Sequence, residues 1–359
     1  MTVDVTVMGG GIFGLSIAYE CARRGAKVTV IERNRIGAGS SGGPVGALAP
    51  HVPERWNAKK AFQLEALLIA NQFWQGVQQT SGLDPAYART GRIQPLPDDQ
   101  AVEQAHIRTI DALELWQGQA EWRVTGDSPG WCGASPTGLW IHDTLSARIA
   151  PRAALAALAR AIVTLGGKIV EEGGRPSLAE PDGTVVWATG LAGLEELNQS
   201  QGHLAGNGVK GQAARFCAAV GPDAPQLFTE GLHFVPHADG TLAVGSTSER
   251  YWQEADTTDA QLEGLIDHAR RLCPALRNAT LVERWAGVRP RAITRAPLLG
   301  PWPGRPGHYI ANGGFKIGFG IAPKVASTMA DLLLDGRQEI PQGFLPAAAT
   351  TALAPGDGS

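Results

Sequence analysis

The sequence predicts a mixed fold, in which an α/β part with a parallel sheet is interrupted by an α+β part with an antiparallel sheet. Three observations support this prediction. Residues 5–33 hold a strand, a glycine-rich turn, a helix and a second strand in immediate succession. Residues 183–190 and 308–336 add strands that run into glycine-containing turns, as the returning strands of a parallel sheet do. Residues 208–250 carry short strand patterns separated by turns, which is typical of antiparallel strands.

The first segment follows the pattern of a dinucleotide-binding βαβ unit. Val3–Met8 reads as a buried strand, and Gly9-x-Gly11-x-x-Gly14 follows it directly. The first glycine permits a tight turn, the second lets a pyrophosphate approach the main chain, and the third lets the helix pack on the strand. A helix over 12–24 would then present its N-terminal amides to that pyrophosphate. We therefore expect a Rossmann-type domain that binds an adenine dinucleotide, rather than a structural turn without a ligand.

An acidic residue closes this unit at the end of its second strand. Glu32 lies 18 residues after Gly14, close to the spacing at which a carboxylate holds the hydroxyls of the adenosine ribose. A carboxylate there also repels the 2′-phosphate of NADP. These residues alone leave both FAD and NAD open.

The remaining elements follow from periodicity and from turn residues. Residues 33–51 are dense in Gly, Ser and Ala, so we expect a loop in close contact with the ligand. A capping box from Thr258 to Gln261 opens one helix, and the last helix has Pro323 in its first turn and ends at Gly336. Helices are expected over 58–80, 98–116, 146–165 and 258–273, and strands over 89–96, 168–170 and 183–190.

These elements divide the chain into two discontinuous domains and a tail. The expected nucleotide-binding domain comprises residues 1–80, 143–205 and 285–340. The expected substrate domain, with the antiparallel sheet, comprises residues 81–142 and 206–284. Residues 341–359 are expected to form a flexible tail, because their end is rich in Ala, Thr, Pro and Gly.

Composition limits the classes of partner. The 359 residues carry a formal net charge of -3 without a basic stripe, which argues against nucleic acid. No apolar run reaches about 18 residues, so no membrane span is expected. The four cysteines lie far apart in sequence and indicate reduced thiols in a cytoplasmic protein. His233 and His237 alternate on a strand, but no third ligand is in view, so no metal site is expected.

Five segments in order resemble the FAD-dependent D-amino-acid oxidase family, especially its glycine oxidase and sarcosine oxidase branch. They are "GGGIFG" with "IER", "GAGSSGG" with "GALAP", "VVWATG", "WAGVRP", and "GGFKIGFGIAP" before the last helix. The resemblance covers about residues 3–336. It implies FAD as the cofactor and oxidation of the C–N bond of a small amino acid or amine.

The resemblance also implies which residues contact FAD. They are Gly9, Gly11, Ile12, Phe13 and Gly14 at the pyrophosphate; Glu32 and Arg33 at the adenosine ribose; Ser40, Ser41, Gly46, Ala47 and Leu48 along the pyrophosphate and flavin; Arg175 at adenine through its backbone; Thr189 and Gly190; and Gly314, Phe315, Lys316, Ile317, Gly318, Phe319 and Gly320 around the pyrimidine end of the flavin.

Two departures from the family pattern refine this expectation. Members with covalent flavin use a cysteine near the last glycine-rich loop, and none follows Cys273 here, so we expect noncovalent FAD. Sarcosine oxidases carry a lysine near the flavin where this sequence has Gly320, which weakens the sarcosine oxidase reading.

Four residues are candidates for binding the substrate. In the family, the arginine of "GVRP", here Arg289, binds the substrate carboxylate, and its planar fork matches two carboxylate oxygens. The alternative is a surface or interdomain arginine. Lys316 matches a basic position near the substrate in glycine oxidase, or is a solvated loop lysine. His51 after "GALAP" could face the substrate, and Tyr251 could hydrogen-bond a carboxylate; either could equally be an ordinary polar residue.

The implied reaction needs few protein acids or bases. Arg289 would orient the carboxylate while the free amine form passes a hydride to flavin N5, and the imine product would hydrolyse in water. Oxygen or another acceptor would then take the electrons. Alternatives are an FAD-dependent dehydrogenase of a 2-hydroxy acid, an oxidoreductase of a modified tRNA base, and a non-catalytic flavin-binding subunit. The sequence leaves open whether the chain forms a homo-oligomer.

Overall fold

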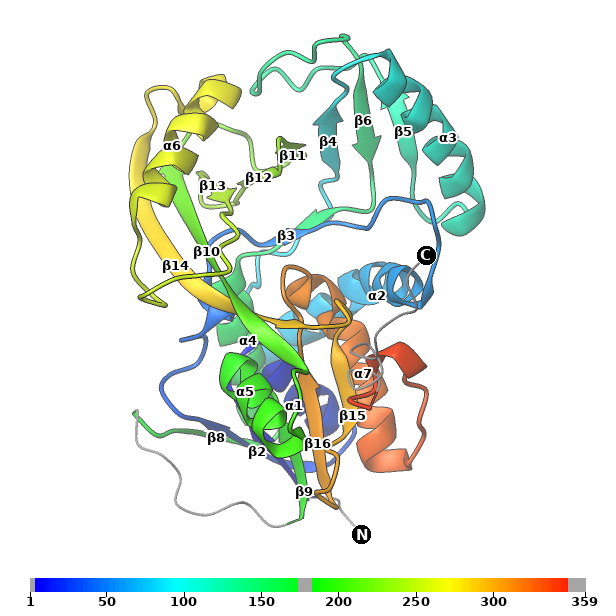
Figure 1. Ribbon diagram of the computed structural model, residues 1–359, viewed down its shortest axis with the longest axis vertical. Coiled ribbons are helices and arrows are strands. Elements are labelled where there is room, and N and C mark those ends of the chain that lie inside the picture. Colours follow the sequence, from blue (N-terminus) through cyan, green and yellow to red (C-terminus); the bar gives the residue numbers. More distant parts are fainter. Residues whose placement is uncertain (1–3, 174–182, 348–359) are drawn as a thin grey trace.

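The structure is a computed structural model that describes residues 4–173 and 183–347. Its strands form two large sheets, each with its own helices, and a two-stranded ribbon between them (Figure 1). The six-stranded sheet lies in the lower part of Figure 1, and the eight-stranded sheet in the upper part. This combination confirms the predicted fold class.

The six-stranded sheet is the parallel sheet of the nucleotide-binding part. Its order is β15-β16-β9-β1-β2-β8, so β1 lies in the centre with β2 on one side and β9 on the other. An order that reverses direction at the first strand is that of a doubly wound sheet, which binds ligands beyond the carboxyl ends of its central strands. The parallel strands are β1 (Asp4–Met8), β2 (Lys27–Glu32), β8 (Lys168–Glu171), β9 (Thr184–Trp187) and β16 (His308–Asn312), and the antiparallel edge is β15 (Leu298–Pro301).

Helices cover both faces of this sheet. The largest core cluster joins the sheet to α1 (Ile12–Arg23), α4 (Pro151–Thr164) and α7 (Gly318–Asp335), and α2 (Ala58–Ser81) packs outside them on α4 and α7. On the opposite face, α5 (Gly190–Gln201) closes a smaller core. That smaller core contains Leu194, Leu197, Ala205, Ala292, Leu298, Trp302 and Ile310.

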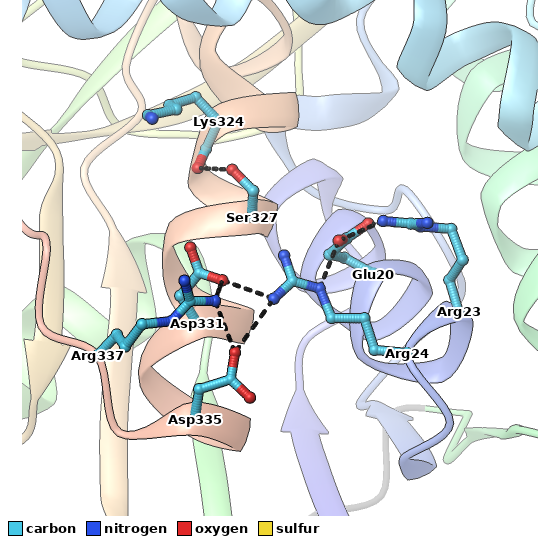
Figure 2. Close-up of polar contacts among 8 residues, drawn as sticks. All are labelled: Glu20, Arg23, Arg24, Lys324, Ser327, Asp331, Asp335 and Arg337. Atoms are coloured by element: carbon cyan, nitrogen blue, oxygen red, sulfur yellow. Dashed lines mark hydrogen bonds and ion pairs between the residues drawn. The ribbon is translucent and has the colours of Figure 1, made fainter.

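Polar contacts fix α1 against α7 near the C-terminal ends of both helices (Figure 2). The guanidinium of Arg24 donates to Glu20 at 2.7 Å and to Asp331 of α7 at 2.6 Å. Arg337 donates to the same Asp331 carboxylate at 2.8 Å. The pairs at Asp331 are partly exposed and each contributes little to stability, whereas the Glu20 carboxylate is buried. They nevertheless hold the two helices side by side, and both helices begin at a glycine-rich segment.

The eight-stranded sheet has the order β14-β10-β13-β12-β11-β4-β6-β5. Its two longest strands, β10 (Gly206–Cys217) and β14 (Thr280–Ala292), run from this sheet down to the six-stranded sheet, where α5 packs on both (Figure 1). The other strands are β4 (Arg92–Pro95), β5 (Trp122–Thr125), β6 (Trp140–Asp143), β11 (Gln226–Thr229), β12 (Leu232–Pro236) and β13 (Thr241–Gly245), and the accompanying helices are α3 (Asp99–Leu115) and α6 (Ala260–Leu272).

The two faces of this sheet differ in chemistry. One face is apolar and packs on α6, with Phe216, Phe234 and Val244 in its core. The strand register places four directly aligned residues on the other face: Trp285 of β14, Ala213 of β10, Gly245 of β13 and His233 of β12. We call this second side the near face, because it faces residues 43–45 of the loop that follows β2. His237, on the same side of β12 as His233, donates from Nε2 to the carbonyl of Pro44 at 3.0 Å.

Three element boundaries differ from the sequence predictions. The helix expected over 146–165 begins only at Pro151, because Ala147–Arg148 forms β7 and pairs with β3 (Ala47–Leu48). The expected capping box is wrong, since Asp259 and not Thr258 caps α6, accepting from the Gln261 amide at 2.9 Å.

The last helix begins earlier than predicted. It starts at Gly318, so Pro323 lies inside the helix rather than in its first turn. Gly318 and Gly320 have low helix propensity, yet they form the first turn of α7, where Cβ atoms would make ordinary van der Waals contact with Ile12 of α1 and Leu67 of α2. Propensity alone therefore does not place the start of this helix.

Two further parts of the predicted organisation need adjustment. The expected flexible tail is packed at its start, where Phe344 is buried edge-to-face against Phe62 at 5.1 Å between ring centroids; residues 348–359 lie outside the described residues. The boundary expected between residues 284 and 285 cuts through β14, which stays in the eight-stranded sheet as far as Ala292. We propose the same two-domain division with this boundary moved to residue 292.

Candidate functional site

The turn between β1 and α1 is built from glycines with separate structural reasons. Gly9 has a φ of 108°, and a Cβ there would lie 2.5 Å from the carbonyl oxygen of Ala188. A Cβ on Gly14 would overlap the carbonyl oxygen of Gly9. Both glycines are therefore required by contacts within the chain itself. At Gly11 a Cβ would meet only the Ser41 hydroxyl, so this glycine leaves the start of α1 open.

Two side chains hold this turn in place. The Glu32 carboxylate accepts from the Gly10 amide at 2.7 Å and from the Asn34 amide at 2.9 Å. The Ser41 hydroxyl accepts from the Ile12 amide at 3.1 Å. Glu32 therefore shapes the glycine turn, a role that the sequence did not predict for it. A carboxylate has about four lone-pair sites, so it can still accept from ribose hydroxyls.

The start of α1 fits a dinucleotide pyrophosphate. The first amides of a helix have no partner within the helix. Among the described residues, the Ile12 amide is bonded to Ser41, whereas the amides of Gly11, Phe13 and Gly14 have no partner. Unpartnered amides at the positive end of a helix bind phosphate groups. The observed arrangement therefore suits the group that the sequence predicted here.

The C-terminal glycine loop lies directly beside this helix start. A Cβ on Gly314 would lie 2.9 Å from the Phe13 ring. The Phe315 amide donates to the carbonyl of Pro290 in β14 at 3.0 Å, and the Ile317 amide donates to Gly314 at 2.9 Å. The loop therefore joins the start of α1 to the strand that carries Arg289. Gly318, Phe319 and Gly320, which were expected in this loop, lie in the first turn of α7.

The other predicted FAD contacts fall into three groups. Ser40 and Ser41 lie in a short helix, Ser40–Gly42, beside Gly11. Ala47 and Leu48 form β3, and Gly46 has a φ of 66°, where a Cβ would also overlap the Ile149 carbonyl oxygen. Thr189 and Gly190 begin α5 next to Gly9. Arg33 is exposed, and Arg175 lies outside the described residues.

Arg289 is a buried cation on the near face. The residue is 8% exposed, and its guanidinium lies over Gly211 of β10, where a Cβ would overlap it. Its Nη1 donates to the carbonyl of Thr247 at 3.4 Å. Burial lowers the pKa of Arg289 to about 10, and Glu249 partly offsets this shift. Among the described residues, no carboxylate lies within ion-pair distance of it, so the guanidinium is available to an external anion.

Lys316 adds a second positive charge next to Arg289. Its Nζ lies 5.8 Å from the centroid of the Phe315 ring. Partial burial, and then repulsion by Arg289 and Arg291, lowers the pKa of Lys316. No carboxylate of the described part of the chain is paired with Lys316. Arg289 and Lys316 therefore make the space near the glycine loop attractive to an anionic ligand.

His51 is held in one orientation by Gln63 of α2. The Gln63 side-chain oxygen accepts from the His51 backbone amide at 2.8 Å and also contacts Nδ1 of the His51 ring. The side-chain nitrogen of Gln63 donates to the carbonyl of Ala49 at 3.0 Å. Burial and then the charge of Lys59 lower the pKa of His51. The imidazole is therefore neutral near pH 7, and its Nε2 remains available as an acceptor.

Tyr251 does not join these residues. Its side chain is 91% exposed, because the chain turns outward after Glu249. The neighbouring Trp252 instead packs on β10, where a Cβ on Gly208 would lie 2.9 Å from its ring. Tyr251 is therefore not part of the site that we propose.

Two aromatic residues of the near face were not predicted as substrate-site residues: Trp285 was not a candidate, and His233 was considered only as a metal ligand. The Trp285 ring lies over Gly287 and Gly43, at 2.5 and 3.2 Å from the Cβ positions of these glycines. His233 lies against Phe228, with 4.6 Å between ring centroids. Its Nδ1 is buried without a hydrogen-bond partner in the described residues. Only the spacing of Trp285 and Gly287, two residues apart on one strand face, could have indicated this contact from sequence.

Among the described residues, no three His, Cys, Asp or Glu side chains are grouped so that they could hold a metal ion. His233 and His237 share the near face, but His237 is bonded to the Pro44 carbonyl. The chemistry of this site therefore depends on its cations, its neutral imidazoles and the group held by the glycine loops.

Comparison with known proteins identifies that group. Residues 4–332 match the family described as FAD dependent oxidoreductase (DAO). The chain belongs to this family. The cofactor that fits the free amides at the start of α1 is therefore FAD, and the sequence-based choice between FAD and NAD is decided.

Relatives of this FAD dependent oxidoreductase include glycine oxidases. The glycine oxidase of Pseudomonas putida is 28% identical over 349 residues, which cover 93% of this chain and 95% of that protein. The glycine oxidase of Pseudomonas aeruginosa is 29% identical over 365 residues, covering 97% and 99%. The crystal structure of glycine oxidase from Geobacillus kaustophilus has the same fold, with a TM-score of 0.82 at 21% identity over 96% of this chain and 98% of that chain.

Replacing Gly14 with Ala should weaken FAD binding. The added Cβ would overlap the Gly9 carbonyl, so α1 would have to move away from the turn. We expect the Kd for FAD to rise at least about tenfold and the free energy of unfolding to fall by about 1–3 kcal/mol. Titration of apoprotein with FAD, followed by flavin fluorescence, and urea unfolding measure the two effects.

Gly264→Ala is the matched control for this substitution. Gly264 lies in α6, where a Cβ would have nothing within 4 Å. Alanine there should leave FAD affinity unchanged and raise the stability of the helix by about 0.5–1 kcal/mol. Equal FAD affinities of the Gly14 variant and the wild type would contradict the proposed role of the turn.

His233 should make the fold less stable in acid. Burial, and then Arg92 and Lys316, lowers its pKa to about 3, whereas an unfolded chain takes up the proton near pH 6.5. Because the folded pKa is depressed for a cationic acid, stability falls as pH decreases below 6.5. His233→Phe, which keeps an aromatic ring on Phe228, should reduce the slope of unfolding free energy by up to about 1.4 kcal/mol per pH unit between pH 4 and 6. Urea unfolding at several pH values measures that slope, and an unchanged slope would show that His233 is not buried in this way.

Proposed function

We propose that this FAD dependent oxidoreductase oxidises the C–N bond of a small amino acid or amine, of the glycine, D-amino acid or N-methyl amino acid type. The observation that carries the proposal is the buried guanidinium of Arg289, which has no carboxylate partner among the described residues and lies on the strand to which the C-terminal glycine loop is bonded. A substrate carboxylate would satisfy this charge. The glycine oxidases among the relatives support the same class of substrate.

The residues of the near face have separate tasks in this reaction. Arg289 binds and orients the carboxylate through two parallel N–H donors of its planar guanidinium, and Gly211 provides the space for that group. Lys316 adds positive charge on the side of the glycine loop. FAD, when bound, supplies the acceptor for the two electrons of the broken Cα–H bond. Orientation of the substrate at that acceptor is then the main contribution of the protein.

Neutral groups complete the pocket. His51 is neutral near pH 7, so it accepts a hydrogen bond at Nε2 without repelling a cationic amine. His233, which packs on Phe228, and Trp285, which lies over Gly43 and Gly287, are aromatic groups of the near face that would exclude water from the reacting atoms. Exclusion of water strengthens the attraction between Arg289 and a carboxylate. The imine product would hydrolyse after release.

Other properties are part of the same proposal. We expect FAD to be noncovalently bound, and oxygen or another acceptor to reoxidise it. The four cysteines are free thiols, three of them buried, which supports a cytoplasmic protein. In the described part of the chain, no helix has the length and apolarity that a bilayer crossing requires.

A substrate panel tests the reaction type. Glycine, D-amino acids, sarcosine and 2-hydroxy acids are mixed anaerobically with the holoenzyme, and loss of flavin absorbance near about 450 nm reports reduction. We expect bleaching by at least one amine-bearing carboxylate and none by its hydroxy analogue. Bleaching by hydroxy acids alone would assign the second candidate function, a 2-hydroxy acid dehydrogenase, for which Arg289 fits equally well. A holoenzyme that no compound bleaches would favour the non-catalytic subunit.

Arg289→Ala should raise KM for carboxylated substrates. Loss of a buried, charged hydrogen-bond pair costs about 2–4 kcal/mol, which corresponds to roughly 30- to 900-fold. Steady-state kinetics on the best substrate of the panel measure the change. The control is Arg284→Ala, because Arg284 lies on the same strand but is exposed and paired with Glu263. Unchanged KM in the Arg289 variant would remove this residue from the site.

A further inference from the structure

Behind Arg289, on the other side of strand β10, lies a cluster of polar side chains that the proposed reaction does not use. Lys210 and Gln212 flank Gly211 on β10, so they point away from the near face that carries Arg289. Glu249 approaches them from the segment after β13, and its backbone is hydrogen-bonded to that of Lys210 in both directions. Lys210, Gln212 and Glu249 are all buried. Buried ionisable groups are costly unless paired, so this cluster calls for a structural or functional reason.

The cluster ties three parts of the chain together. Gln212 Nε2 donates to Glu249 at 3.0 Å and to Asp259 at 2.8 Å, and its side-chain oxygen accepts from the Asp259 amide at 2.9 Å. The Lys210 ammonium lies 3.3 Å from Asp259 and 3.9 Å from Glu249. Asp259 is the N-cap residue of α6. Strand β10, the segment 246–249 and the start of α6 are therefore held by one network.

Thr247 connects this network to Arg289. Its hydroxyl accepts from the Gln212 amide at 2.8 Å and donates to the Glu249 carboxylate, and its own amide donates to Gln212 at 3.1 Å. Its carbonyl accepts from Arg289 Nη1 at 3.4 Å. Among the described residues, this is the one hydrogen bond of that guanidinium. The oxygen that anchors Arg289 therefore belongs to a residue whose amide and hydroxyl are both fixed by the network.

The charges of the network also complement Arg289. Lys210 contributes one positive charge, and Glu249 and Asp259 contribute two negative charges. Asp259 is half-exposed, whereas the Glu249 side chain is only 4% exposed, so the Glu249 charge is screened least by water. A surplus negative charge across β10 thus reduces the cost of burying Arg289. It remains too far from the guanidinium to compete with a ligand as an ion pair.

We propose that Thr247 and Glu249 are positioning residues, which hold Arg289 in the orientation that binds the substrate carboxylate. The inference rests on the proposed role of Arg289. It predicts a change in anion affinity opposite in direction to the change that the charge of Glu249 alone would produce. Removal of the negative charge of Glu249 would by itself strengthen binding of an anion to Arg289. Loss of the anchor at Thr247 would weaken it, because the guanidinium would then have to be ordered by the ligand.

The test measures acetate binding to the holoenzyme through the change that it causes in the visible flavin spectrum. Thr247→Val removes the hydroxyl and keeps the carbonyl, and we expect the Kd for acetate to rise about three- to tenfold, as for the loss of one or two buried hydrogen bonds. Thr247→Ser restores the hydroxyl and should return the Kd to within about twofold of wild type. With the amino acid substrate, Thr247→Val should raise KM and leave kcat nearly unchanged.

Thr241→Val is the matched control. Thr241 lies at the other end of β13, and its hydroxyl also bonds a carboxylate, that of Asp239 at 2.6 Å. Its removal should not change acetate binding. An unchanged Kd in Thr247→Val, or equal weakening in Thr247→Val and Thr247→Ser, would overturn the positioning role of Thr247.

Glu249→Gln separates positioning from charge. Glutamine keeps an oxygen for the Thr247 hydroxyl but loses the pairing with Lys210, so we expect weaker acetate binding than in wild type. Tighter binding would show that Glu249 acts through its charge alone and would contradict the proposal. Arg289→Ala is included to test the underlying assumption. If that variant binds acetate as wild type does, the proposed function fails; if it loses binding while the Thr247 and Glu249 variants keep it, only the positioning network fails.

Discussion

The whole site depends on how closely α1 approaches the turn that precedes it. Gly14 lies against the Gly9 carbonyl at a separation that no side chain could tolerate, and a Cβ on Gly9 would lie only 2.5 Å from the carbonyl oxygen of Ala188, the residue that follows β9. This contact places the first amides of α1 at the carboxyl ends of the central strands, where those of Gly11, Phe13 and Gly14 have no partner among the described residues. Three unpartnered amides and a helix dipole are costly in an isolated protein and favourable beside a phosphate. The backbone geometry therefore prepares a site for the FAD pyrophosphate before any side chain is considered.

The proposed substrate side of the site follows from the different chemistry of the two faces of one sheet. Period-two alternation sends Phe216, Phe234 and Val244 to the apolar core under α6, and it sends glycines, histidines and Arg289 to the near face. A shift of register by one residue would exchange these two sets. The bonding of β10 to both β13 and β14 fixes that register. Stability of the sheet and correct placement of Arg289 consequently have the same origin.

The sequence predicted the parts of the molecule that depend on local spacing. Gly9, Gly11, Gly14 and Glu32 could be assigned from their distances along the chain, because one turn and one helix relate them directly. The β3–β7 ribbon could not, since its strands are about a hundred residues apart and only two residues long. Helix α5 was missed because it starts directly after β9 and Thr189 makes no side-chain cap. Contacts such as Trp285 over Gly43, or Thr247 behind Arg289, exist only once strands from distant segments are in register.

The burial of Arg289 costs folding free energy. A buried guanidinium without a paired carboxylate destabilises the folded protein, and replacement by an apolar residue of similar volume would be expected to stabilise the sheet. Gly211 adds a further cost, because a glycine within a strand loses more backbone entropy than other residues do and contributes no side chain to packing. The negative charge of Glu249 offsets part of the cost of burying Arg289, and an anion bound on the near face would offset more of it. The arrangement thus supports the proposed binding of an anionic ligand, and so does Lys316, which has no paired carboxylate among the described residues.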